Sequence, residues 1–178
     1  ISGIETSERA IYGGGPGEIV ALDHIVHDMR LVKSAAEIRM IRSALTASER
    51  GHLRAMAATR PGVTEHMLEA ELRYGFAEAG SRHIAYPCIV AGGENGCTMH
   101  YIDNTSVLKD GDLVLLDAGA EYGYYASDVT RTYPVNGRYS SQQRALYTVV
   151  LEAQASAIDA ARAGADFNAP HRAAVGVI

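Results

Sequence analysis

Hydrophobic residues in the first half of the chain recur every three or four positions, which is typical of helices. This period predicts one helix over 35–59 and a second that begins at Thr64 and ends at Gly80. Ser34 and Glu37 have the spacing of a capping box at the start of the first helix. The apolar positions are Ile38, Ile41, Leu45, Leu53 and Met56 in the first helix, and Leu68, Leu72, Phe76 and Ala79 in the second.

Residues 84–132, in the middle of the chain, have the pattern of strands and not of helices. Short runs of β-branched and aromatic residues alternate with glycine-rich segments, which predicts antiparallel strands. We expect strands over 84–90 and 97–101 on either side of a tight turn at 92–96, followed by a hairpin over 113–132. This order of helices and strands predicts an α+β fold, with helices on one face of an antiparallel sheet.

Helical periodicity returns near the end of the chain. Ser140 and Gln143 form a second capping box before a helix that Gly164 closes, and Asn168 can begin another helix that is cut in mid-course. At the other end, residues 1–30 carry too little apolar surface for a core of their own. We expect 1–30 to be a remnant of a preceding domain with its linker, and 31–178 to be a truncated α+β domain.

The predicted hairpin carries the most informative residues, Asp117 and Asp128. With Tyr122 and Gly123 as a two-residue loop, the two aspartates lie directly opposite each other, with Cβ atoms about 5 Å apart. Leu113 shares the face of Asp117, so this face should be partly buried. Carboxylates this close repel each other unless a cation or a shared proton lies between them.

A divalent metal site, with two ions, is the interpretation we favour for this pair. Hard oxygen donors supplemented by imidazole suit such ions. His100 is the best additional donor, because the predicted strand brings it near Asp117. Simpler interpretations remain: the aspartates could cap a turn and pair with Arg131 on the surface, and His100 could be a core histidine bonded to a carbonyl oxygen. Glu49 and His52, three residues apart, are expected to be an exposed structural pair.

Composition narrows the possible partners. The 178 residues have a net charge of −5 and a pI near 5.8, and their basic residues do not cluster, which argues against nucleic acid and anionic membranes. No stretch approaches the roughly 20 apolar residues of a membrane helix. Two cysteines and no recognisable signal segment favour a cytoplasmic protein.

Three segments resemble the Xaa-Pro aminopeptidases, also called aminopeptidase P. They are 89–101, 112–119 and 128–137, and the similarity extends from about residue 25 to the end. Prolidase is the next relative, and methionine aminopeptidase is more distant. The resemblance implies a pita-bread fold with two pseudo-symmetric α+β halves. It also implies a site with two manganese ions, cobalt or zinc being possible, that removes an N-terminal residue preceding proline.

The resemblance also implies roles for individual residues. Asp117 and Asp128 would be metal ligands, and His100 would match the histidine that helps to stabilise the reacting carbonyl group. Tyr86 would line the substrate site, and Thr130 would orient Asp128 without touching the metal. The family's remaining ligands, a histidine and two glutamates, have no counterpart in this sequence. The chain would therefore be the first half of the catalytic domain and inactive alone.

Two other functions remain open at this point. The chain could belong to a prolidase-type dipeptidase or a creatinase-like hydrolase, or it could be a non-catalytic pita-bread-like module that binds peptides or proteins. We expect peptides with proline at the second position as substrates, and a homo-oligomer.

Overall fold

The computed structural model describes residues 21–178. The chain divides into two compact units, Ile1–Ile38 and Arg39–Ile178. In the described part of the first unit, helix α2 (Asp23–Leu31) has no buried residue. The predicted remnant and linker over 1–30 lie largely outside the described residues, and the division into domains stays a prediction.

Helices α3 (Ala35–Ala58) and α4 (Glu65–Glu78) occupy the two segments that periodicity predicts. The capping box of α3 is confirmed: the Ser34 N–H donates to Glu37 Oε2 at 2.6 Å, and the Glu37 N–H donates to Ser34 Oγ at 3.3 Å. The packed face of α3 nevertheless consists of small and polar residues, whereas most of its large apolar residues, such as Leu45, Leu53 and Met56, are exposed. The buried residues of α3 are Ala44, Ala47, Ser48, Gly51, His52 and Ala55.

Two glycines explain why α3 packs through small side chains. Gly51 on α3 and Gly75 on α4 meet so closely that a Cβ on Gly75 would lie 2.5 Å from the Gly51 Cα. Such backbone contact leaves no room for leucine or methionine between the helices. The sequence therefore predicted the helical period of α3 correctly, but contact with α4 decided which face of α3 is buried.

Gly75→Ala should destabilise the fold by about 1–3 kcal/mol, because the added methyl would collide with backbone atoms that cannot rotate away. Gly96→Ala is a suitable control, since the nearest atoms to its new Cβ lie 3.7 and 4.0 Å away. The measurement is the free energy of unfolding in urea. Equal stability of the two variants would show that the helices separate at little cost.

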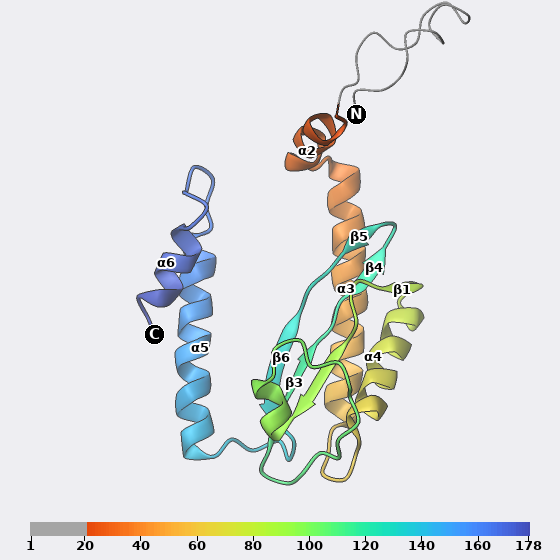
Figure 1. Ribbon diagram of the computed structural model, residues 1–178, viewed down its shortest axis with the longest axis vertical. Coiled ribbons are helices and arrows are strands. Elements are labelled where there is room, and N and C mark those ends of the chain that lie inside the picture. The colour runs from red at the N-terminus through yellow and green to blue at the C-terminus, as the bar shows by residue number, and fades with distance from the viewer. Residues whose placement is uncertain (1–20) are drawn as a thin grey trace, which may run out of the picture. The chain divides into compact units, whose positions relative to one another are not determined.

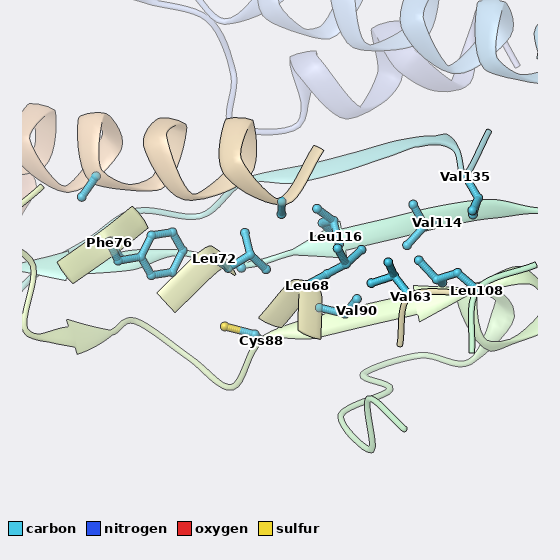
Figure 2. Packing of buried hydrophobic residues seen from close by; sticks show 14 residues of the cluster. Val63, Leu68, Leu72, Phe76, Cys88, Val90, Leu108, Val114, Leu116 and Val135 are labelled. Carbon is cyan, nitrogen blue, oxygen red and sulfur yellow. The ribbon is translucent and has the colours of Figure 1, made fainter. Parts of the chain in front are cut away.

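In residues 21–178, six strands form two antiparallel three-stranded sheets (Figure 1). One sheet has the order β1-β4-β5 and the other β2-β3-β6. The core lies between the second sheet and the helices α3 and α4, where Leu68 lies beside Leu116 and the cluster extends to Phe76 at one end (Figure 2). The strands are β1 (His83–Ile84), β2 (Ile89–Gly92), β3 (Leu113–Asp117), β4 (Ala120–Tyr122), β5 (Tyr125–Ala126) and β6 (Thr130–Pro134).

Strand β3 alternates as predicted. Val114 and Leu116 are fully buried against the helices, whereas Leu113, Leu115 and Asp117 are half-buried on the opposite face. The period of two thus places Asp117 on the face that is turned away from the main core.

The predicted return strand over 97–101 is wrong. Residues Gly93–Cys97 form a 3₁₀ helix, η1, and His100 lies in the turn that follows, with a φ of 55°. Strand β2 pairs instead with β3. On the other edge of β2, the side chain of Asn104 pairs with the backbone. It accepts from the Val90 N–H at 3.0 Å and donates to the Cys88 carbonyl oxygen at 2.9 Å. A side chain therefore takes the place of the expected strand.

A buried carboxylate supports this loop. Glu65, the first residue of α4, is fully buried. Its Oε1 accepts from the Gly92 N–H at 2.8 Å and from the Asn95 amide at 2.9 Å. Its Oε2 accepts from the Tyr101 hydroxyl and the Ser106 N–H, both at 2.8 Å. Four donors satisfy the carboxylate and fix the segment that leads into and out of the His100 turn.

The turn and register predicted for the aspartate hairpin are also wrong. The loop consists of Gly123 and Tyr124, with φ of 57° and 68°, and Tyr122 pairs with Tyr125. Positive φ at both loop positions is the requirement of a type I′ hairpin. Asp117 therefore faces Thr130 directly. A shift of two residues keeps every side chain on its predicted face, because the period of a strand is two.

The C-terminal helices follow the prediction more closely. Helix α5 (Ser141–Ala160) begins with the expected capping box, in which the Ser140 N–H donates to Gln143 Oε1 at 2.9 Å. Helix α6 (Ala169–Val175) has proline in its first turn and packs on α5. Residues of α5 and of strands β3 and β6 together line a cavity of about 500 Å³, on the sheet face away from the main core.

Candidate metal centre

The two predicted aspartates converge on one hydroxyl group. Asp117 is half-buried at the end of β3, and Asp128 is exposed just before β6. The Tyr86 hydroxyl oxygen lies 2.6 Å from Asp117 Oδ1 and 2.9 Å from Asp128 Oδ1. The predicted convergence is confirmed, although the two residues are not directly paired. It arises because the register shift left both carboxylates on one side of the hairpin.

Gly119 allows this close approach. A Cβ at this position would lie 1.8 Å from the Ser127 carbonyl oxygen and 2.9 Å from Tyr86 Cε1. The segment before Asp128 and the tyrosine ring therefore both pack against bare backbone. Any larger residue at 119 would push Tyr86 and Asp128 away from Asp117.

The electrostatics of this cluster favour a cation. Tyr86 has one hydroxyl proton and so can donate to only one of the two carboxylates at a time. Burial raises the pKa of Tyr86 well above its ordinary value, and the contacts with Asp117 and Asp128 raise it further. The phenol therefore stays protonated, and among residues 21–178 neither carboxylate forms an ion pair. Hard oxygen donors in this arrangement fit a divalent ion.

His100 lines the same cavity as the aspartates. The cavity has a volume of about 430 Å³, and its walls are Tyr86, Pro87, Ile89, His100, Ile102, Asp117 and Asp128. The histidine side chain is exposed, so it is not the core histidine of the simpler interpretation. Its backbone has a positive φ, a conformation in which histidine is over-represented among residues other than glycine.

Thr130 does not reach Asp128. It lies opposite Asp117 in the ladder between β3 and β6, and its exposed side chain lines the cavity beneath α5. Within residues 21–178, its hydroxyl makes no hydrogen bond to Asp128. The orienting contact implied by the family resemblance is therefore not formed in this structure.

The two aspartates supply only part of a metal coordination sphere. Among residues 21–178, no three His, Cys, Asp or Glu side chains are grouped so that they could hold a metal ion. Asp117 and Asp128 both line one cavity and offer carboxylate oxygens that suit a divalent ion. Further ligands would have to come from other residues.

The sequence analysis did not identify the residues of α3 that form hydrogen bonds to the hairpin. Glu49 and His52 were both expected to be exposed. Glu49 is exposed, but His52 is buried, with only 4% of its surface accessible. The His52 Nε2 lies 3.0 Å from the Ala118 carbonyl oxygen. Burial lowers the pKa of His52, so the imidazole is neutral near pH 7. The spacing of Ala44, Ser48 and His52, four residues apart, is the signal that could have identified a buried helix face.

Comparison with known proteins decides the family. Residues 39–178 match "Metallopeptidase family M24", which is more than half of the chain. The chain belongs to metallopeptidase family M24. Its fold is the N-terminal part of a pita-bread fold, as predicted: the structure of Pseudomonas aeruginosa aminopeptidase PepP superposes with a TM-score of 0.93 at 50% identity, covering 97% of this chain and 39% of that one. A zinc-substituted Escherichia coli aminopeptidase P in complex with product superposes with a TM-score of 0.91 at 39% identity, covering 96% and 40%.

Curated relatives of this chain include proteins named Xaa-Pro aminopeptidase. The Escherichia coli enzyme is 44% identical over 84% of this chain and 34% of its own length, and the Haemophilus influenzae enzyme is 45% identical over 80% and 33%. The chain therefore spans about a third of the length of these relatives.

Proposed function

We propose that the complete protein containing this chain is a metal-dependent aminopeptidase that removes an N-terminal residue preceding proline. The observation that carries the proposal is the convergence of Asp117 and Asp128 on Tyr86, at 2.6 and 2.9 Å, in a chain of metallopeptidase family M24. The relatives named Xaa-Pro aminopeptidase support the substrate class, and a substrate complex of Escherichia coli aminopeptidase P supports a peptide substrate.

Asp117 and Asp128 would each contribute carboxylate oxygens to two divalent ions, for which we propose manganese, with cobalt or zinc as alternatives. When bound, such ions would supply a water of lowered pKa as the nucleophile for the peptide carbonyl. The Tyr86 hydroxyl, within hydrogen-bond distance of one oxygen of each carboxylate, would donate to one aspartate at a time, and all three residues line the cavity.

His100 would assist from the cavity wall. Its imidazole, carried on a turn that Glu65 supports from both sides, can donate to the substrate carbonyl oxygen as negative charge develops there. For Thr130 we propose a structural role, because its side chain lines the cavity next to α5 and its hydroxyl makes no hydrogen bond to Asp128.

Two carboxylates cannot hold two ions against water, so we propose that these 178 residues are inactive without the rest of the protein. From the resemblance, the missing ligands are a histidine and two glutamates. A prolidase-type dipeptidase would use the same aspartate pair and differs in substrate length. A non-catalytic peptide-binding module would retain the fold and lack the remaining ligands.

The deciding experiment compares the complete protein with residues 1–178 alone, each with added Mn²⁺. Each is assayed on an X-Pro-X tripeptide and on a Gly-Pro dipeptide. We expect the complete protein to release the first residue of the tripeptide, to lose activity with a chelator and to regain it with manganese. Preference for the dipeptide would favour a prolidase, and metal-independent peptide binding without cleavage would favour the module. Tight binding of two ions by the 178 residues would contradict our account of the ligands.

Cytoplasmic location and homo-oligomerisation remain proposals. Among the helices that the structure describes, none is long and apolar enough to cross a membrane. The apolar residues that periodicity identified on α5 are mostly exposed, for example Leu146 at 66% and Ile158 at 65%. Such a surface is available for contact with other parts of the protein or with another copy.

A further inference from the structure

One face of α3 makes hydrogen bonds to the residues next to both aspartates: to the backbone of Ala118 and Ala120, and to the hydroxyl of Ser127. The contacts come from the Ala44 carbonyl, the Ser48 hydroxyl and the His52 imidazole, which we call the α3 polar ridge. We infer that the α3 polar ridge positions Asp117 and Asp128, and so sets the affinity of the centre for divalent ions. This inference rests on the proposed function, because it concerns the same metal centre.

His52 holds the strand that carries Asp117. A carbonyl oxygen can only accept, so the contact with Ala118 at 3.0 Å requires the proton of the imidazole to be on Nε2. Ala118 directly follows Asp117, and its own N–H donates to the Val129 carbonyl at 3.1 Å. The imidazole therefore anchors the peptide on the C-terminal side of the first aspartate, where β3 ends.

Ser48, one turn earlier on α3, holds both strands of the hairpin. Its hydroxyl accepts from the Ala120 N–H at 2.8 Å and lies 2.8 Å from the Ser127 hydroxyl. Ser127 in turn lies within 3.2 Å of the Ala44 carbonyl oxygen and directly precedes Asp128. Ser48 thus ties the residue before the second aspartate to the strand beyond the first.

Packing alone does not explain why position 52 is a histidine. Among the described residues, His52 Nδ1 is the buried side-chain atom without a hydrogen-bond partner. Leaving a buried acceptor unpaired lowers stability, so an apolar residue of similar size would pack here at less cost. The compensating gain is the bond from Nε2 to Ala118. Groups that orient metal ligands without touching the metal typically change metal affinity about 10- to 100-fold when they are removed.

The test uses the complete protein and the variants His52→Leu, His52→Gln and Ser48→Ala. Leucine keeps the volume and removes the donor, whereas the amide of glutamine can still donate to Ala118. Glu49→Gln is the matched control, because Glu49 lies on the same helix and lines the same cavity as His52 but is exposed. The readouts are the Mn²⁺ dissociation constant from titration of the metal-free protein, thermal unfolding without metal, and kcat and KM.

We expect His52→Leu to raise the Mn²⁺ dissociation constant by about 10-fold or more, Ser48→Ala to weaken binding in the same direction, and His52→Gln to restore most of the affinity. Glu49→Gln should bind Mn²⁺ like the wild type. Wild-type affinity in both His52→Leu and Ser48→Ala would overturn the inference while leaving the proposed function intact. Equal loss in His52→Gln and His52→Leu would also overturn it, because the donor would then be irrelevant. If the wild type itself binds no Mn²⁺, both the proposed function and the inference fail.

Discussion

Asp117→Asn and Asp128→Asn should each abolish tight Mn²⁺ binding in the complete protein and reduce peptide cleavage to background. Asparagine keeps the size of the side chain and an oxygen for the Tyr86 hydroxyl, but it removes the negative charge that holds a divalent ion. The loss should exceed the roughly 10- to 100-fold cost of removing an outer orienting group. Metal titration and single-turnover assays with an X-Pro-X tripeptide measure it.

Asp159→Asn is the control for this pair of substitutions, because Asp159 is an exposed residue of α5 outside the cavity. It should bind Mn²⁺ and cleave peptide at wild-type levels. Since Asp117 and Asp128 are only half-buried or exposed, their asparagine variants should also unfold near the wild-type temperature. Undiminished metal binding in Asp117→Asn would remove the basis of the proposed centre.

Glu65→Gln should produce the largest loss of stability. An amide keeps the shape of the side chain but replaces one oxygen with an NH₂ group, which then faces a buried donor: the Gly92 N–H in one orientation or the Ser106 N–H in the other. Hydrogen bonds to a charged group contribute about 1.5–3 kcal/mol each, so we expect a loss of at least ~3 kcal/mol in the free energy of unfolding. Activity should fall as well, because the turn that carries His100 loses its support.

Glu71→Gln is the matched control on the same helix. Glu71 pairs with Arg54 at 2.8 Å, and their side chains are 36% and 39% exposed. An exposed ion pair of this kind contributes under ~1 kcal/mol. Urea unfolding of both variants decides the matter: a Glu65→Gln protein as stable as Glu71→Gln would mean that the loop finds other acceptors.

Short-range signals in the sequence were reliable. Both capping boxes formed, because the serine and the residue three positions later meet within one turn of helix. The alternation along β3 correctly separated the core face from the face of Asp117. The convergence of the aspartates survived an incorrect register, since a shift of two residues does not change the face of a strand.

Predictions that required a partner segment were less reliable. The residues over 97–101 have strand-like composition, yet Glu65 and Asn104 from other parts of the chain replace the strand with η1 and a turn. His52 has an ordinary position in the helical period, and only its contact with Ala118, 66 residues away in sequence, shows that it lies next to the candidate metal centre.

The amino-acid sequence by itself determined the helices, the α+β class and the pair of acidic residues on one hairpin face, because these follow from spacing within a few residues. Only the tertiary structure decided which face of α3 is buried, where His100 lies, and which side chains hold Asp117 and Asp128 in place. Those outcomes depend on close approach between distant segments, through Gly51, Gly75 and Gly119, and on buried hydrogen bonds whose partners no local pattern specifies.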